Sequence, residues 1–128
     1  MNKRKEKQMI YKNDLIHIKF EENEIPWFIV FTNEKKKEFS HCTQEEKMEI
    51  LRCLDIIEKL MLEYYNPEKV NIASFGNYVP HVHFHIMARF KEDSFFPESM
   101  WGKKQRESNL KLPSNKEFIS SLKIKLNS

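Results

Sequence analysis

Three histidines occupy alternate positions of one short segment, and this spacing is the pattern in the sequence best suited to chemistry. The segment reads Pro80-His81-Val82-His83-Phe84-His85-Ile86. Side chains alternate between the two faces of a β-strand, so a strand here would project the three imidazoles from one face, about 6.6–6.8 Å apart. An imidazole titrates near pH 6.5 and can serve at neutral pH as nucleophile, acid, base or metal ligand. Such a row could hold a phosphate group or a metal ion.

Three interpretations of this row compete. Burying three imidazoles for packing alone would carry a large desolvation cost. A metal site is the second interpretation, since three histidines make a known zinc site, with Glu22 or Asp93 as further ligands from elsewhere in the chain. The third is covalent catalysis, in which a neutral imidazole nitrogen attacks phosphorus and neighbouring donors stabilise the phosphate charge without a metal. The row favours covalent catalysis and leaves the metal site as its alternative.

The flanking sequence predicts the strands that would position this row. Residues 15–20 alternate apolar and polar side chains, and Trp27-Phe28-Ile29-Val30-Phe31 is an unbroken apolar run. The first pattern is typical of a half-buried strand and the second of a strand covered on both faces. Residues 70–74 and 79–90 are predicted as two further strands, separated by the turn signal Gly76-Asn77. Arg89, near the end of the last strand, is expected to face solvent.

Two helices are predicted from their start signals and apolar periodicity. Thr43-Gln44-Glu45-Glu46 has the residues of a capping box and begins an amphipathic helix that ends near Tyr65, before Asn66-Pro67. Ser114-Asn115-Lys116-Glu117 has the residues of a second box, followed by a terminal helix. Strands joined by short turns, with helices to one side, indicate an α+β fold: an antiparallel sheet, a long central helix and a terminal helix.

Length and charge restrict the classes of protein. The length of 128 residues predicts one domain. The chain has 22 basic and 19 acidic residues, and this balance is too even for a nucleic-acid binder. Residues 1–13 include the basic run Lys3-Arg4-Lys5 and are expected to form a flexible arm on a single domain of residues 14–128. No apolar run suits a signal peptide or a membrane span, and Cys42 and Cys53 lack a metal-binding spacing. A cytoplasmic location is therefore expected.

From about residue 15 to residue 101, the chain resembles the histidine-triad (HIT) family. The family motif is His-φ-His-φ-His-φ-φ, with φ apolar, and His81-Val82-His83-Phe84-His85-Ile86-Met87 matches it at every position. The chain is most similar to a bacterial branch that has Gly-Asn-x-Val-Pro before the triad and a Trp-Gly after it, here Trp101-Gly102. The resemblance implies a HIT-like fold and a hydrolase or transferase that cleaves nucleotides at the α-phosphate without a cofactor. It also implies a nucleotidyl-histidine intermediate on His83.

The resemblance assigns roles to individual residues. His85 would donate to phosphate oxygens, and His81 would orient the site and bind phosphate. Asn77, which stands where the family more often has Gln, would contact the phosphate or the leaving group. Asn71 would bind phosphate, and Glu22 would hold the ribose hydroxyls. These five residues, together with His83 and Trp101, form the predicted site.

The remaining predictions concern the ligand and the assembly. Trp101 lies beside Gly102 in a polar stretch, where it would either cover a ligand or pack against the protein. The expected substrate is a dinucleoside polyphosphate, a nucleoside phosphoramidate or a sugar nucleotide, with a purine base, and the resemblance implies a homodimer. The alternative functions are a nucleotide-binding regulatory module with little turnover and a His-ligated metalloprotein.

Overall fold

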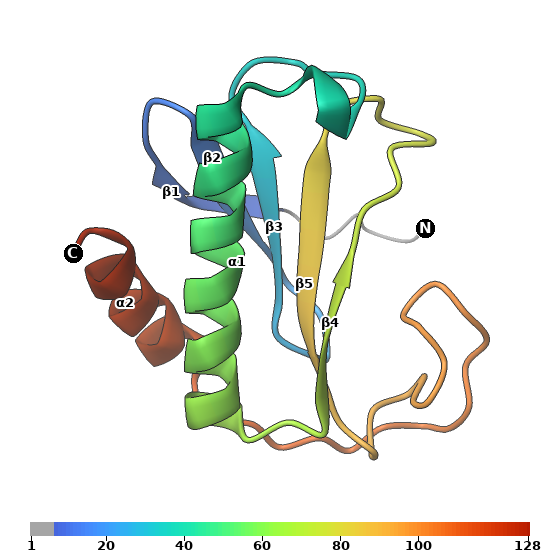
Figure 1. Ribbon diagram of the computed structural model, residues 1–128. Helices are drawn as coiled ribbons and strands as arrows, with labels where there is room; N and C mark the ends of the chain where they lie inside the picture. The colour runs from blue at the N-terminus through green and yellow to red at the C-terminus, as the bar shows by residue number, and fades with distance from the viewer. Residues whose placement is uncertain (1–6) are drawn as a thin grey trace.

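The computed structural model describes residues 7–128, which form a five-stranded antiparallel sheet with two helices packed on one of its faces (Figure 1). The strands lie side by side in the order β1-β2-β3-β5-β4. Their bounds, and those of the helices, are β1 (Lys7–Lys12), β2 (Ile16–Glu21), β3 (Trp27–Thr32), α1 (Gln44–Tyr65), β4 (Lys69–Ala73), β5 (His83–Arg89) and α2 (Asn115–Leu126). The predicted α+β fold, with its long helix and terminal helix, is confirmed.

Strand alternation divides the sheet into a core face and an open face. On β3, Phe28 and Val30 are fully buried toward the helices, and Phe28 stacks at a tilt against Phe118 of α2. Phe31 points to the opposite face, where it lies between two residues in register, His17 on β2 and His83 on β5. The face away from the helices therefore carries the histidines.

Helix α1 begins at the capping box that the sequence predicts. The N–H of Glu46 donates to Thr43 Oγ1 at 3.1 Å, and the N–H of Thr43 donates to Glu46 Oε1 at 2.7 Å. The helix ends at Asn66, whose left-handed φ of 48° turns the chain before the proline that follows. The second predicted box is wrong, because Ser114 makes no side-chain cap bond, and α2 is held by its buried apolar stripe instead.

Residues 7–12 form a strand, so the prediction of a flexible arm over residues 1–13 is wrong for this part of the chain. Strand β1 pairs with β2, and Ile10 is buried in the core. The hydroxyl of Tyr11 also donates to the carbonyl of Leu126 at 3.4 Å. Residues 1–6 of the predicted arm, with the basic run, lie outside the described residues.

Strand β5 begins at His83, four residues later than predicted. The N–H of Val82 donates to the carbonyl of Lys36 at 2.7 Å, in the loop after β3, and the N–H of His81 donates to the carbonyl of Val79 at 2.8 Å. These bonds hold residues 79–82 outside the sheet ladder. Neither helix in residues 7–128 combines the length and the apolar character needed to cross a membrane.

Candidate functional site

His83 lies at the first position of β5, and its hydrogen bond defines which ring nitrogen is free. Its Nδ1 lies 2.6 Å from the carbonyl oxygen of His81. A carbonyl can only accept, so Nδ1 carries the proton and, in the neutral ring, Nε2 carries the lone pair. The ring stacks on Phe31 at 5.2 Å and 22°. The geometry leaves Nε2 as the ring nitrogen that carries the lone pair in the neutral side chain.

His85 has the opposite tautomer, because its neighbour is a donor. The indole Nε1 of Trp27 donates to His85 Nδ1 at 3.0 Å, and an indole N–H cannot accept. In the neutral ring the proton is therefore on Nε2. Burial, with smaller contributions from the charges of His83 and Lys7, lowers the pKa of His85 to about 4. At pH 7 this histidine is neutral and offers an Nε2–H donor.

His81 lies before β5, so the prediction that one strand carries all three histidines is wrong for this residue. Its Nε2 lies 2.7 Å from the carbonyl oxygen of Thr32, at the end of β3. Because that oxygen accepts, Nε2–H is the donor. The ring still lies on the same side as His83, since both contact Phe31. His81 thus attaches to β3 through its ring and to His83 through its carbonyl.

A cavity of about 430 Å³ opens in front of His83 and His85. Two residues predicted for the site, Asn77 and Trp101, line it as well. They come from the loop between β4 and β5 and from the long segment after β5. The other lining residues are Lys7, Phe75, Gly76, Tyr78 and Val79. Gly76 has a φ of 80°, which glycine adopts without strain and which turns the loop toward the histidines.

Lys7 is the charged lining residue that sequence reasoning missed. It follows a basic run that predicts a flexible arm, and its own sequence neighbourhood carries no signal of a site. It reaches the cavity only because β1 pairs with β2, which places Lys7 opposite Glu21. Lys7 Nζ lies 3.8 Å from Glu21 Oε1.

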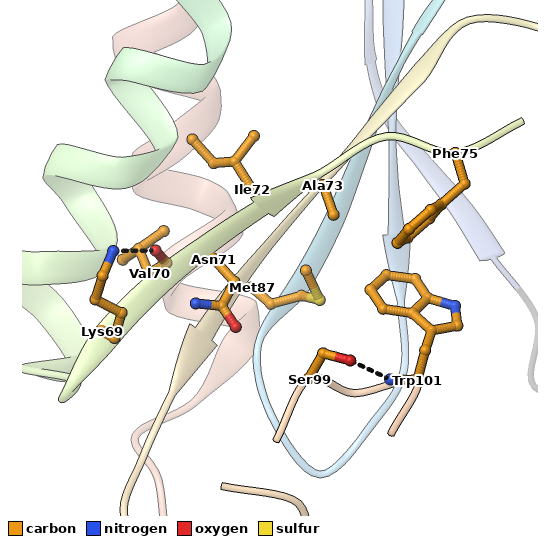
Figure 2. A pocket seen from close by; sticks show the side chains of 9 residues that line it. All are labelled: Lys69, Val70, Asn71, Ile72, Ala73, Phe75, Met87, Ser99 and Trp101. Atoms are coloured by element: carbon orange, nitrogen blue, oxygen red, sulfur yellow. Dashed lines mark hydrogen bonds between the residues drawn. The ribbon is translucent and has the colours of Figure 1, made fainter. Parts of the chain in front are cut away.

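Trp101 is half-exposed and its ring contacts three other rings edge-on. The ring centroids lie 4.9 Å from His85, 4.9 Å from Phe75 and 5.3 Å from Trp27. Figure 2 shows Trp101 and Phe75 forming one wall of a second cavity, of about 340 Å³, which Asn71, Met87 and Ser99 also line. Trp101 therefore separates the histidine cavity from its neighbour.

The structure does not bring Asn71 and Glu22 to the histidine cavity. Asn71 lies in the second cavity, where its Oδ1 accepts a hydrogen bond from Arg89 Nη1 at 2.8 Å. Glu22 is exposed on the turn between β2 and β3. The carboxylate of the same turn that does make contacts is Glu24, which accepts from the N–H and hydroxyl of Ser94 at 2.6 and 2.7 Å.

Arg89 is buried, so the expectation that it faces solvent is wrong. Its guanidinium forms a bidentate pair with Asp93, at 2.9 Å from Nε to Oδ2 and 3.1 Å from Nη2 to Oδ1. Burial would raise the pKa of Asp93, but hydrogen bonds from Arg89 and from three backbone amides lower it below its usual value. Asp93, named above as a metal-ligand candidate, is thus engaged with Arg89.

Comparison with known proteins relates this arrangement to one family. The family model of the HIT domain matches residues 2–92. A histidine triad protein from Bradyrhizobium japonicum has a similar structure, with a TM-score of 0.76 and 24% identity over 94% of this chain and 90% of its own. A histidine triad protein from Marinobacter aquaeolei VT8 has a TM-score of 0.70 and 25% identity, over 94% of this chain and 85% of its own. A histidine triad protein from Sinorhizobium meliloti 1021 has a TM-score of 0.71 and 21% identity, over 94% of this chain and 87% of its own. No curated protein matches the sequence.

Proposed function

Because the chain belongs to the HIT family, we propose that it is a nucleotide hydrolase or transferase that cleaves a phosphate linkage at the α-phosphate. His83 forms the covalent nucleotidyl-histidine. The observation that carries this proposal is the 2.6 Å hydrogen bond from His83 Nδ1 to the carbonyl of His81. In the neutral ring this bond places the lone pair on Nε2, on a ring that lines the cavity, and a nucleophile requires such a lone pair.

The reaction proceeds in two displacements. His83 Nε2 attacks the α-phosphorus, and the bond from phosphorus to the leaving group breaks, with its electron pair leaving on that group; an amine leaving group takes up a proton from solvent. Water, or the hydroxyl of another acceptor in a transferase, then attacks phosphorus and gives its proton to solvent, while the bond between phosphorus and nitrogen breaks and its electron pair returns to Nε2. His83 is restored and a nucleoside monophosphate is released or transferred.

Donors in the cavity stabilise the charge on the phosphate oxygens. The Nε2–H of His85 is one donor, and the side-chain amide of Asn77 is another from the same cavity wall. His81 contributes by orientation, since its ring is held by Thr32 and its carbonyl holds His83. Neither of the two proposed displacements uses a metal ion or a cofactor.

The other predicted residues have more peripheral roles in this proposal. Trp101, whose ring borders the cavity, covers the base of a purine nucleotide. Asn71 binds phosphate from the second cavity, and Glu22 holds the ribose hydroxyls from the turn before β3.

A homodimer is proposed on the basis of α1. Three apolar side chains of this helix, Met48, Leu51 and Leu62, are about half exposed. A second copy of the chain would cover them in an isologous interface.

The buried free thiols of Cys42 and Cys53 are in keeping with a cytoplasmic location.

Turnover in excess EDTA tests the proposed function. Diadenosine tetraphosphate and adenosine phosphoramidate are incubated with the native chain, His83→Ala and a control, His41→Gln, which changes an exposed histidine outside the cavity. We expect His83→Ala to lose activity by about 10³-fold or more, and an intact-mass increase of one AMP on the native chain quenched at alkaline pH.

Three results would contradict the proposal. Equal turnover by His83→Ala would exclude this residue as the nucleophile. Tight binding of AMP without any product would favour the nucleotide-binding module. Activity that EDTA abolishes and zinc restores would favour the His-ligated metalloprotein.

A further inference from the structure

The side chains of residues 7–128 that line the histidine cavity supply little positive charge, although the proposed substrate is an anion. His83 must be neutral to attack phosphorus, and His85 is held neutral by burial and by the donor that occupies its Nδ1. Within residues 7–128, the side chains that line this cavity include one with a formal charge, that of Lys7. Among the described lining residues, Lys7 is therefore the one whose charge can attract a second negative group.

Lys7 is fixed at the cavity by the sheet. It lies at the start of β1, in register with Glu21 at the end of β2. The Nζ–Oε1 distance of 3.8 Å makes an ion pair that is longer than a hydrogen bond. This pair therefore directs the ammonium group without using one of its N–H donors. The charge of Lys7 is also among those that lower the pKa of His85, which indicates that the two groups are close.

We propose that Lys7 is the binding site for a second phosphate of the substrate, adjacent to the phosphate that His83 attacks. The α-phosphate already has donors in His85 and Asn77, so an ammonium beside them is available to the next phosphate along the chain. Lysine suits this task, because it is a compact charge on a flexible stem and binds phosphate without a fixed orientation. This inference rests on the proposed function.

The substrate that follows has a phosphate chain, as in a dinucleoside polyphosphate. The leaving group of a nucleoside phosphoramidate is an uncharged amine, and the α-phosphate is its one phosphate. Lys7 therefore adds little to the binding of this substrate. A stabilising role alone does not account for the residue, since a partly exposed Lys–Glu pair contributes little to folding. Lys7 thus determines specificity between two substrates that share the same attacked phosphorus.

Comparing two substrates in matched variants tests this site. We measure kcat/KM for diadenosine tetraphosphate and for adenosine phosphoramidate with the native chain, Lys7→Gln and Lys7→Arg. The control is Lys12→Gln, an exposed lysine of the same strand that does not line the cavity. We expect Lys7→Gln to lose about tenfold on the tetraphosphate and less than about twofold on the phosphoramidate. Lys7→Arg should retain most of the tetraphosphate activity, and Lys12→Gln should equal the native chain.

Equal losses on both substrates, or no loss on either, would overturn the assignment of Lys7 while leaving the proposed function intact. A probe that needs no turnover separates the two cases further: calorimetry with inorganic tripolyphosphate and with inorganic monophosphate. The native chain should bind tripolyphosphate more tightly, and Lys7→Gln should abolish the difference. If the native chain turned over neither substrate, the proposed function would fail, and the calorimetry would still decide for or against the phosphate site.

Discussion

The indole N–H of Trp27 donates to Nδ1 of His85 at 3.0 Å, from the first residue of β3 to the third residue of β5. Both side chains are more than nine-tenths buried, with exposed fractions of 5% and 8%. Because an indole can only donate, the bond holds one tautomer of the imidazole. Trp27 therefore acts on the candidate site through His85, as a positioning residue.

Replacing Trp27 with Phe tests this role. The substitution keeps an aromatic ring in the core but removes the donor, so His85 should become a mixture of tautomers and its Nε2–H should lose its fixed direction. We expect kcat/KM to fall by about tenfold, the cost of one well-placed hydrogen bond to a developing charge. The tautomer is read from the ¹⁵N chemical shifts of the His85 ring.

The matched control is Trp101→Phe, which changes a neighbouring indole that also contacts the ring of His85 edge-on. This variant should keep the native ¹⁵N shifts of His85, whatever it does to nucleotide binding. If Trp27→Phe also kept them, Trp27 would be a packing residue only.

The lowered pKa of His85 predicts a pH dependence of folding stability. In the unfolded chain this histidine takes up a proton near pH 6.5, whereas in the native protein it does so only near pH 4. Between these values the unfolded state binds more protons, so the free energy of unfolding should decrease as the pH falls from 6.5 to 4. The contribution of this group is about 3 kcal/mol at most.

Urea unfolding at a series of pH values measures this contribution, with His85→Asn as the comparison. The variant removes the titrating group, so its unfolding free energy should fall less steeply between pH 6.5 and 4. His17, whose pKa is lowered chiefly by burial, remains in both proteins and cancels in the difference. Parallel curves for the two proteins would show that His85 titrates normally.

Much of this fold could be predicted from local patterns in the sequence. Alternating residues gave β2, the apolar run gave β3, and the Thr43 capping box gave the start of α1. These signals depend on neighbours within a few positions, which is why they are readable in one sequence. The HIT-like fold, expected from the histidine motif, is confirmed by structures that align over most of the chain.

The parts that could not be predicted depend on pairing between distant segments. Residues 7–12 have a weak apolar pattern, and they form strand β1 by pairing with β2. Trp27 and His85 are 58 positions apart, so their hydrogen bond requires the register of β3 and β5. His81 leaves the strand because the amide of Val82 bonds to Lys36 in another loop. Local spacing carries none of this information.

The buried pair of Arg89 and Asp93 predicts a large loss of stability when its negative partner is removed. The two side chains are 2% and 0% exposed, and Asp93→Asn would leave the guanidinium charge without a counter-charge. We expect the free energy of unfolding to fall by about 3–5 kcal/mol in urea. The control is Asp55→Asn, which removes an exposed ion pair with Lys59 on α1 and should change stability by less than about 1 kcal/mol. Similar changes in both variants would mean that the guanidinium of Arg89 does not depend on Asp93 for its counter-charge.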